Sequence, residues 1–429
     1  MRLLVTGAAG MIGAATCARA VQSGHRVGAV VRPGRGARPA GVERVIEADL
    51  AQVTDSAFWA APLEGVDAVV NCAGVLQAGA GQSPERVHHE AVAALFAACL
   101  EQDVRRVVHL SAIGVERGAV SPFSATKAAG DRALMALDLE WVILRPSVVL
   151  GPGASGAGAL IRGLAGWPVL PLVGNTGKLQ VVQLGEVVKT ILFFADARAP
   201  SRVALDLAGP ERLTFAEVVD SYRRWLGRPP ARRLELPGWL AALLFRLGDA
   251  AGRLGWRPAL RSNAAREIVR GAVGDPTAWR RLTGIAPRTL QASLTARPAT
   301  PQERLFARLF LLQPVVIAVL AFFWIGTGVI SLGPGLGFGA ELLRIAGLPA
   351  LAVPGVIAGA LADIAIGSAI LYRPWSRAAL WGAVLLSLFY MLTGTLLMPE
   401  LWRDPLGPML KIWPILALNL VALGMLDER

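Results

Sequence analysis

The chain has 429 residues, of which 54% are hydrophobic and only 17% are charged, and its mean hydropathy is +0.50. Ordinary globular proteins carry about 25% charged residues, so the composition argues against a wholly soluble protein and predicts membrane segments. The net charge of +12 is concentrated in residues 201–308, which carry 19 Lys and Arg against 9 Asp and Glu. Since no nucleic-acid-binding motif accompanies this excess, it predicts contact with anionic lipid head groups and not with nucleic acid.

The first residues predict a nucleotide-binding turn. Residues 1–6 (MRLLVT) are typical of a short buried strand, and the sequence GAAGMIG follows directly. In this pattern Gly7 permits a tight turn, Gly10 lets the backbone approach a pyrophosphate, and Gly13 lets the next helix pack on the strand. The N–H groups at the start of that helix then face the phosphates. Because the triplet opens a strand–turn–helix unit, dinucleotide binding is favoured over a turn used only for packing.

Strands and helices alternate along the rest of the first half. The segment between Pro84 and Gln102 has a helical pattern, and five further runs are apolar and bounded by turn residues. The runs are HRVGAVVR (25–32), VERVIEADL (42–50), VDAVVNCAG (66–74), RRVVHLSAIG (105–114) and LEWVILRPSVV (139–149). This alternation predicts an α/β Rossmann-type fold with a doubly wound parallel sheet. We place the dinucleotide-binding domain at 1–150, and a small substrate lobe with a basic juxtamembrane region at 151–300.

The end of the second expected strand indicates which nicotinamide cofactor is bound. NAD-selective folds place Asp or Glu there, about twenty residues after the glycines, to bind the ribose hydroxyls. This chain has Arg32, Arg35 and Arg38 at that place and no acid. Arg32 is suited to a 2′-phosphate, so we expect NADP in preference to NAD. The alternative is that these arginines lie in a solvated loop.

The stretch SPFSATKAAGD (121–131) contains candidate catalytic residues. Ser121, followed by proline, favours the start of a helix. Phe123 and Lys127 are four residues apart and share one face of that helix. Lys127 also stands four residues before Asp131, so an exposed ion pair between them is the alternative to a role in cofactor binding.

Together these motifs resemble the short-chain dehydrogenase/reductase superfamily, in its extended and atypical branches of the NAD-dependent epimerase/dehydratase kind. The resemblance covers residues 1–295. It rests on TGAAGMIG (6–13), EADL (47–50), NCAG (71–74), HLSAIG (109–114), the helix with Lys127, and LRPSVVLGPG (144–153). It implies that Ser111 orients a substrate oxygen and that a fixed set of positions binds the cofactor. These are Gly7, Gly10, Met11, Ile12 and Gly13 at the pyrophosphate, Asp49 and Leu50 beside the adenine, Ala73, Gly74 and Pro146 beside the nicotinamide, and Lys127 at its ribose.

The chain departs from this superfamily at Phe123. Members of the superfamily have a tyrosine there, which acts as general acid or base beside the lysine. Phenylalanine keeps the ring and lacks the hydroxyl. The chain has only three tyrosines, Tyr222, Tyr372 and Tyr390, and none lies in the dinucleotide-binding half. This inventory argues against tyrosine-dependent reduction of carbonyls.

Four long apolar runs follow, at 309–332, 350–371, 377–398 and 407–426. Each is long enough to cross ~30 Å of hydrocarbon as a helix. The block resembles the small four-helix DoxX-like membrane family, which implies an all-α four-helix transmembrane bundle at 305–429. Arginines before the first run and between the second and third favour both termini in the cytoplasm. Because glycines interrupt the N-terminal apolar run, it does not resemble a secretory signal, and we expect a multi-pass protein of the inner (plasma) membrane.

Two features of the second half are open to more than one interpretation. Asp363 lies inside the second run, where an acid is a functional candidate, and it alone motivates a transporter-like role. The favoured alternative is a hydrogen bond to a hydroxyl or amide of another span, such as Thr327, Ser387, Thr393 or Asn419. The segment 236–258 is apolar on one face and carries arginines elsewhere. It is expected on the bilayer surface, over the substrate cleft, or packed on its own lobe.

These observations predict a membrane-anchored NAD(P)-dependent oxidoreductase-like protein. It would act on a small apolar or membrane-associated substrate such as a quinone or a lipid. The alternative is a catalytically inactive NADP-binding sensor or assembly subunit, which the loss of the tyrosine at Phe123 favours. The three cysteines form no CxxC pair and the four histidines lack metal-ligand spacing, so we expect no metal site.

Overall fold

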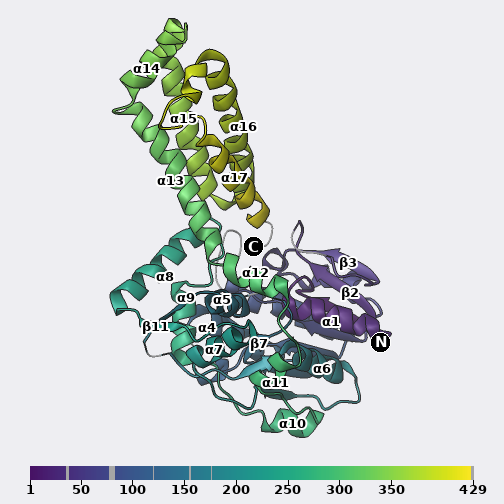
Figure 1. Cartoon of the computed structure of the whole chain (residues 1–429). Helices are drawn as coiled ribbons and strands as arrows, with labels where there is room; N and C mark the ends of the chain where they lie inside the picture. Colours follow the sequence, from purple (N-terminus) through teal and green to yellow (C-terminus); the bar gives the residue numbers. More distant parts are fainter. Residues whose placement is uncertain (35–37, 77–82, 119, 154–155, 175, 427–429) are drawn as a thin grey trace. The chain divides into compact units, whose positions relative to one another are not determined.

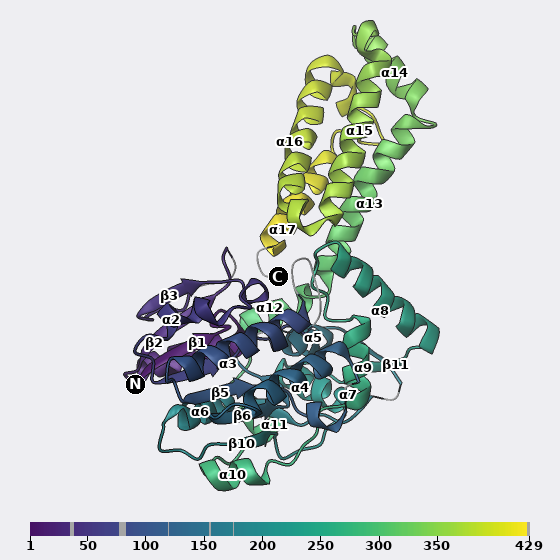
Figure 2. The same ribbon diagram turned by 180° about the vertical axis from the view of Figure 1, so that it is seen from behind.

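The structure, a computed structural model, describes residues 1–34, 38–76, 83–118, 120–153, 156–174 and 176–426. The chain forms two compact units, shown in Figures 1 and 2. The first unit comprises Met1–Asp249 and Pro258–Arg308, and the second comprises Ala250–Arg257 and Leu309–Arg429. A short piece of the middle of the chain therefore belongs to the second unit.

Seven parallel strands form the main sheet of the first unit, in the order β10-β6-β5-β4-β1-β2-β3. The bounds are β1 (Arg2–Thr6), β2 (Arg26–Val31), β3 (Arg44–Glu47), β4 (Ala68–Asn71), β5 (Arg106–Leu110), β6 (Glu140–Pro146) and β10 (Val203–Leu207). This order confirms the doubly wound sheet, and each predicted strand is present with somewhat shorter bounds. The strand order reverses between β1 and β4, which is where such sheets bind their ligands. The chain returns to the sheet through β10 after building part of the lobe.

Alternate residues of each strand support a helix layer on each face of the sheet. In β1, Leu3 and Val5 pack in one core cluster with α1 (Met11–Gln22) and α6 (Leu184–Ala195), whereas Leu4 packs in the other with α3 (Ala91–Glu101). Figure 1 views the sheet from the α1 and α6 side and Figure 2 from the α3 side. Strands buried on both faces read as continuous apolar runs, which is why these runs were visible in the sequence.

Two helices near the site begin in different ways. The predicted helix at 84–102 begins with a π-helical turn, Arg86–Glu90, before α3 continues it. The helix α4 (Pro122–Met135) starts as predicted, with a capping box between Ser121 and Ser124 and proline in its first turn. Reciprocal caps of this kind fix where a helix begins.

The lobe of the first unit carries two small sheets and several short helices. β7 (Val148–Leu150) pairs with β9 (Val181–Gln183), and β8 (Val169–Leu172) pairs with β11 (Arg232–Glu235). The helices of this part are α5 (Gly156–Ala165), α7 (Phe215–Trp225), α8 (Gly238–Arg253), α9 (Ser262–Arg270), α10 (Thr277–Thr283), α11 (Leu290–Thr295) and α12 (Pro301–Leu309). The short helix α2 (Ala60–Leu63) belongs to the main sheet's half, where it precedes β4.

Within its described residues, which end at 426, the second unit contains three helices long and apolar enough to cross a membrane, one fewer than predicted. They are α13 (Leu312–Leu332), α15 (Ala352–Leu371) and α16 (Arg373–Leu397). The fourth run forms α17 (Ile412–Leu426), whose 15 residues rise only about 22 Å. The run beginning at 407 is shortened because its first residues form turns, and a helix α14 (Leu336–Ile345), which was not predicted, precedes the second span.

Glycines allow the spans of the second unit to pack closely. A Cβ on Gly328 of α13 would lie 2.5 Å from the carbonyl oxygen of Ala360 on α15. Asp363 is buried one turn further along α15, and the Tyr390 hydroxyl of α16 donates a hydrogen bond to it at 3.1 Å. The favoured interpretation of Asp363, a hydrogen bond to a hydroxyl of another span, is confirmed. The partner is a tyrosine that was not among the residues we named.

Candidate dinucleotide site

The predicted cofactor residues follow the carboxyl ends of the parallel strands. Gly7 follows β1, Arg32 follows β2, and Ser111 follows β5. Asp49 and Leu50 come just after β3, Ala73 and Gly74 just after β4, and Pro146 ends β6. Because all these strands are parallel, their carboxyl ends share one edge of the sheet, so the fold brings the predicted positions to one edge.

The glycine turn leaves no room for side chains. Gly7 has a φ of 64°, and a Cβ on Gly7 would lie 2.8 Å from the backbone of Cys72. A Cβ on Gly13 would lie 2.2 Å from the Gly7 carbonyl oxygen. Gly10 is the N-cap of α1, and no side chain caps that helix. The start of α1, with Met11 and Ile12 in its first turn, therefore presents backbone N–H groups that fit an anionic pyrophosphate.

The residues after β2 and β3 contact one another. The Arg32 Nε lies 3.7 Å from the Asp49 Oδ1, and both side chains are about one third exposed. Asp49 also accepts a hydrogen bond from the Ala51 backbone at 3.2 Å, so its carboxylate shapes its own turn. Arg38 pairs with Glu47 at 2.6 Å, while Arg35 lies outside the described residues. Arg32 is the arginine held at the end of the strand.

Lys127 is buried at the centre of the site, with 4% of its surface exposed. Its Nζ donates hydrogen bonds to the carbonyl oxygens of Leu110 at 2.8 Å and Ala73 at 3.2 Å, so it joins the ends of β5 and β4. A Cβ on Gly74 would lie 3.4 Å from this Nζ. Burial lowers the pKa of Lys127 to about 8. The alternative of an exposed pair with Asp131 is wrong, since neither residue is exposed.

A row of buried polar side chains lies beneath this edge, and it was not predicted. Thr6 Oγ1 donates to Asn71 Oδ1 at 2.5 Å, and Asn71 Nδ2 donates to His109 Nδ1 at 2.8 Å. His109 Nε2 then lies 3.5 Å from Asp131 Oδ1, and Arg145 donates to the other carboxylate oxygen at 3.0 Å. The row includes residues of β1, β4, β5 and β6. Its one acid, Asp131 of α4, is paired with Arg145 of β6.

Ser111 lies against this row. It is 6% exposed, and its Oγ makes no hydrogen bond of ordinary geometry with any described residue. Burial raises the pKa of Asp131, but His109, Ser111 and Arg145 outweigh that effect and hold it below its ordinary value. Asp131 is therefore ionised at neutral pH. The Ser111 hydroxyl can turn from this carboxylate to a bound ligand, because no hydrogen bond of ordinary geometry holds it in place.

Phe123 contacts a histidine whose single ring proton faces Thr126. The two rings of Phe123 and His88 meet edge to face, with centroids 5.6 Å apart. His88 Nε2 accepts a hydrogen bond from the Val75 backbone at 2.9 Å, so its proton is on Nδ1, which faces Thr126 Oγ1 at 2.9 Å. Burial and the charge of Lys127 lower the pKa of His88 to about 2, so it is neutral.

No tyrosine replaces the missing hydroxyl. Tyr222 lies on α7, where its ring is stacked below Arg162, 5.7 Å from the centroid. Tyr372 and Tyr390 belong to the second unit. The proton donor expected for this superfamily is absent from the site, as the sequence indicated.

The helix α9 contacts three of the loops around the site. Its Glu267 accepts hydrogen bonds from the hydroxyls of Ser121 and Ser124, the latter at 2.9 Å. Asn263 donates to the Leu76 carbonyl oxygen at 2.7 Å, and Arg270 donates to the carbonyl oxygen of Ile113 at 3.1 Å. These contacts were not predictable from local patterns, because the partners are separated by more than 140 residues.

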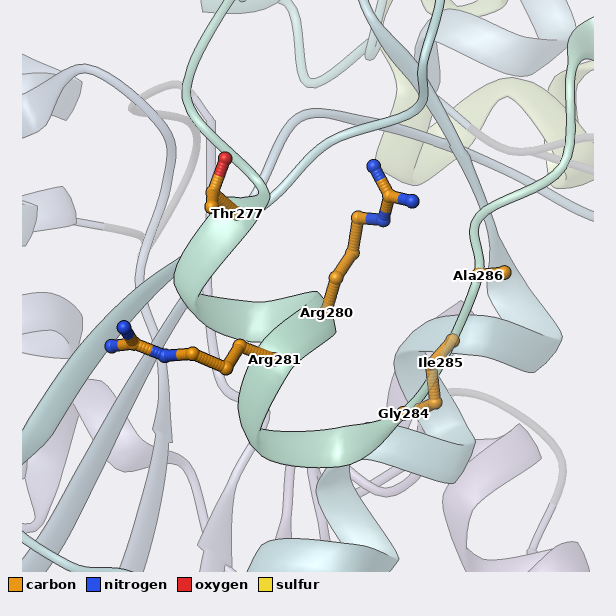
Figure 3. A pocket seen from close by; sticks show the side chains of 6 residues that line it. All are labelled: Thr277, Arg280, Arg281, Gly284, Ile285 and Ala286. Atoms are coloured by element: carbon orange, nitrogen blue, oxygen red, sulfur yellow. The ribbon is translucent and has the colours of Figure 1, made fainter.

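Neither of the two pockets described is lined by any of these site residues. The first, of about 300 Å³, is lined by α10 and the loop after it, and Arg280 and Arg281 extend from it in different directions (Figure 3). It is a shallow surface feature. The described residues contain no group of three or more His, Cys, Asp or Glu side chains placed to bind a metal ion.

Comparison with known families agrees with this architecture. A model of the NAD dependent epimerase/dehydratase family matches residues 3–199, and a model of the DoxX-like family matches residues 321–420. Residues 3–199 therefore form a domain of the NAD-dependent epimerase/dehydratase family. A DoxX-like domain follows in the same chain, and together with the three apolar helices it makes this a membrane protein.

Individual relatives of the epimerase/dehydratase domain are distant. Ceramide reductase of Caulobacter vibrioides is 24% identical over 180 residues, 42% of this chain and 56% of that protein. The mitochondrial protein FMP52 of Eremothecium gossypii is 36% identical over 159 residues, 35% of this chain and 67% of that protein. The chain thus spans little more than half the length of ceramide reductase. The structure of MoeE5 in complex with UDP-glucose and NAD has a TM-score of 0.54 at 24% identity, covering 72% of this chain and all of that one, which shows the shared fold.

Proposed function

We propose that this chain is a membrane-anchored, NADP-dependent oxidoreductase with its soluble unit in the cytoplasm, acting on an apolar or membrane-associated substrate. The observation that carries the proposal is the burial of Lys127 between the ends of β4 and β5, beside a glycine turn that excludes side chains. Two relatives support it by their names. MoeE5 was solved with NAD, which supports a nicotinamide cofactor, and ceramide reductase supports a reductase with a lipid substrate.

The residues present fit such a cofactor. The start of α1 would bind the pyrophosphate, and Arg32 would bind a 2′-phosphate. Lys127, held by two carbonyl oxygens, has a third N–H for a ribose hydroxyl. Ser111 would donate to a substrate oxygen. When bound, NADPH would supply a hydride. The residues named above would bind the cofactor and orient the substrate.

The loss of the tyrosine favours a quinone over a ketone as the acceptor. A hydride added to a ketone leaves an alkoxide, which needs an acid in the site. A hydride added to a quinone leaves a phenolate, whose pKa of about 10 lets water supply the proton. The balance is one quinone, one NADPH and one proton giving one hydroquinone and NADP⁺. Phe123 and the neutral His88 therefore do not prevent this reaction.

Cofactor preference is tested through Arg32. In the full-length protein in lipid nanodiscs, we expect NADPH to bind more tightly than NADH. Arg32→Ala is expected to weaken NADPH binding about tenfold, the loss of one charge-assisted contact, and to leave NADH binding unchanged. Arg38→Ala is the matched control, because the Arg38 side chain is 70% exposed and comes six residues after Arg32, beyond the end of β2. Equal weakening of both nucleotides by Arg32→Ala would contradict the assignment.

Turnover is tested through Phe123. We expect the wild-type protein in lipid to oxidise NADPH with quinones and to reduce ketones only at a trace rate. Phe123→Tyr restores a phenol beside Lys127 and is expected to raise carbonyl reduction by about 100-fold. The measurement is NADPH absorbance with each acceptor. Failure to bind any nucleotide would overturn the proposal.

A second candidate function is favoured by Phe123 itself. The chain would then bind NADP(H) without turnover, as a sensor or an assembly subunit whose DoxX-like domain contacts partners. NADPH binding without oxidation by any acceptor, together with gain of activity in Phe123→Tyr, would support this function.

A further inference from the structure

The helix α8 exposes an apolar stripe. Trp239, Leu243 and Leu247 are 70%, 45% and 57% exposed and lie four residues apart, which places them on one face. The opposite face is packed, since Phe245 is buried and a Cβ on Gly248 would lie 1.8 Å from the Leu260 carbonyl oxygen. Large exposed apolar side chains in a row mark a surface that binds a partner.

The charges beside the stripe are basic. Arg246 and Arg253 are exposed and seven residues apart, so they lie on the same side of the helix, next to the stripe. The one acid of the helix, Asp249, is paired with Arg261 and accepts hydrogen bonds from Ser262. Tryptophan and leucine on one face with arginine at its border is the pattern of a helix that lies in a membrane interface.

The segment that follows α8 contacts the connection between two of the apolar helices. Residues Ala250–Arg257 belong to the second unit, where the Trp256 Nε1 donates to the Leu371 carbonyl oxygen at 2.6 Å. The Arg373 backbone donates to the Leu254 carbonyl oxygen at 2.9 Å, and the Arg373 guanidinium lies 5.5 Å from the centre of the Trp256 ring. Leu371 ends α15 and Arg373 begins α16. A connection between two spanning helices lies at the boundary of the bilayer.

We propose that α8 lies in the head-group layer and binds the bilayer surface through Trp239, Leu243 and Leu247. The pairing of Asp249 with Arg261 and Ser262 joins this helix to the start of α9, which contacts the loops around the dinucleotide site.

The test measures where labels on α8 reside in the full-length protein. A cysteine-free background (Cys17→Ala, Cys72→Ala, Cys99→Ala) carries a nitroxide at Leu243→Cys or Leu247→Cys, in nanodiscs of phosphatidylcholine and phosphatidylglycerol. Gln291→Cys, on the exposed surface of α11, is the matched control. Collision with oxygen, which concentrates in lipid, is compared with collision with a water-soluble nickel chelate. We expect the oxygen-to-nickel ratio on α8 to exceed that of the control about fivefold or more.

Two results would overturn the proposal. The α8 labels could be as accessible to nickel as the Gln291→Cys label, or they could be reached by neither reagent, which would mean that protein covers the helix. The measurement involves no nucleotide, so its outcome is separate from that of the NADPH experiments. Each variant is first checked for unchanged thermal unfolding.

Discussion

Gly13→Ala is expected to abolish nucleotide binding and to lower the free energy of unfolding by about 3 kcal/mol. The added Cβ would lie 2.2 Å from the Gly7 carbonyl oxygen and 2.9 Å from the Cα of Ala8. These neighbours are backbone atoms, which cannot rotate away as a side chain could. The helix α1 would therefore move off the strand, and the turn that fits the pyrophosphate would open. Thermal unfolding and an NADPH fluorescence titration of the full-length protein measure the two effects.

Gly185→Ala is the matched control for this variant. Gly185 lies in the first turn of α6, and nothing lies within 4 Å of the position its Cβ would occupy. Alanine there is expected to stabilise the protein by up to ~1 kcal/mol and to leave NADPH binding unchanged. If Gly13→Ala bound NADPH with wild-type affinity, the glycine turn would not be the pyrophosphate site.

Lys127→Met is expected to abolish NADPH oxidation and to change how stability depends on pH. Burial lowers the pKa of Lys127 to about 8, whereas the unfolded chain keeps this proton up to a pH of about 10.4. Between these values the unfolded state binds the extra proton, so wild-type stability from this group rises with pH. The penalty for burying the charge is fully present below pH 8. It amounts to about 3 kcal/mol, and it is absent from the methionine variant.

The measurement is the difference in unfolding free energy between wild type and Lys127→Met from pH 7 to pH 10. We expect this difference to shift in favour of the wild type as the pH rises. Lys189→Met, at an exposed position of α6, is the control and should change neither the pH dependence nor NADPH oxidation. Parallel stability curves for wild type and Lys127→Met would show that the amine titrates as in water.

The parts of the site that depend on neighbours in sequence were predictable, and those that depend on pairing across the sheet were not. The glycine turn and the cap at Ser121 are local patterns, and both form as expected. Lys127 was predicted to face the cofactor, but its burial depends on which carbonyl oxygens β4 and β5 bring to it. Asp131 is paired with Arg145 because α4 packs against β6, and spacing along the chain favoured Lys127 instead. Such pairings depend on how distant elements pack, so they produce no periodic pattern in the sequence.

In the second unit, too, some features were predictable from the sequence and others were not. Three spans were predicted correctly, since length and apolar composition decide them. The fourth run was expected to be longer than α17, because composition does not show where a helix starts within an apolar run. The segment 236–258 was amphipathic in sequence, and the structure divides it between the two units.

That division has a consequence for how the protein is made. Trp256 is synthesised 115 residues before Leu371, the residue whose carbonyl oxygen it binds. When residues 250–257 leave the ribosome, the helices α15 and α16 have not yet been synthesised. These eight residues can make their contacts with Leu371 and Arg373 only after both helices are present. The rest of the first unit, Pro258–Arg308, is therefore tethered between two segments that are completed in the membrane. No single cut in the chain separates the two units, because the second unit contains residues on both sides of Pro258–Arg308.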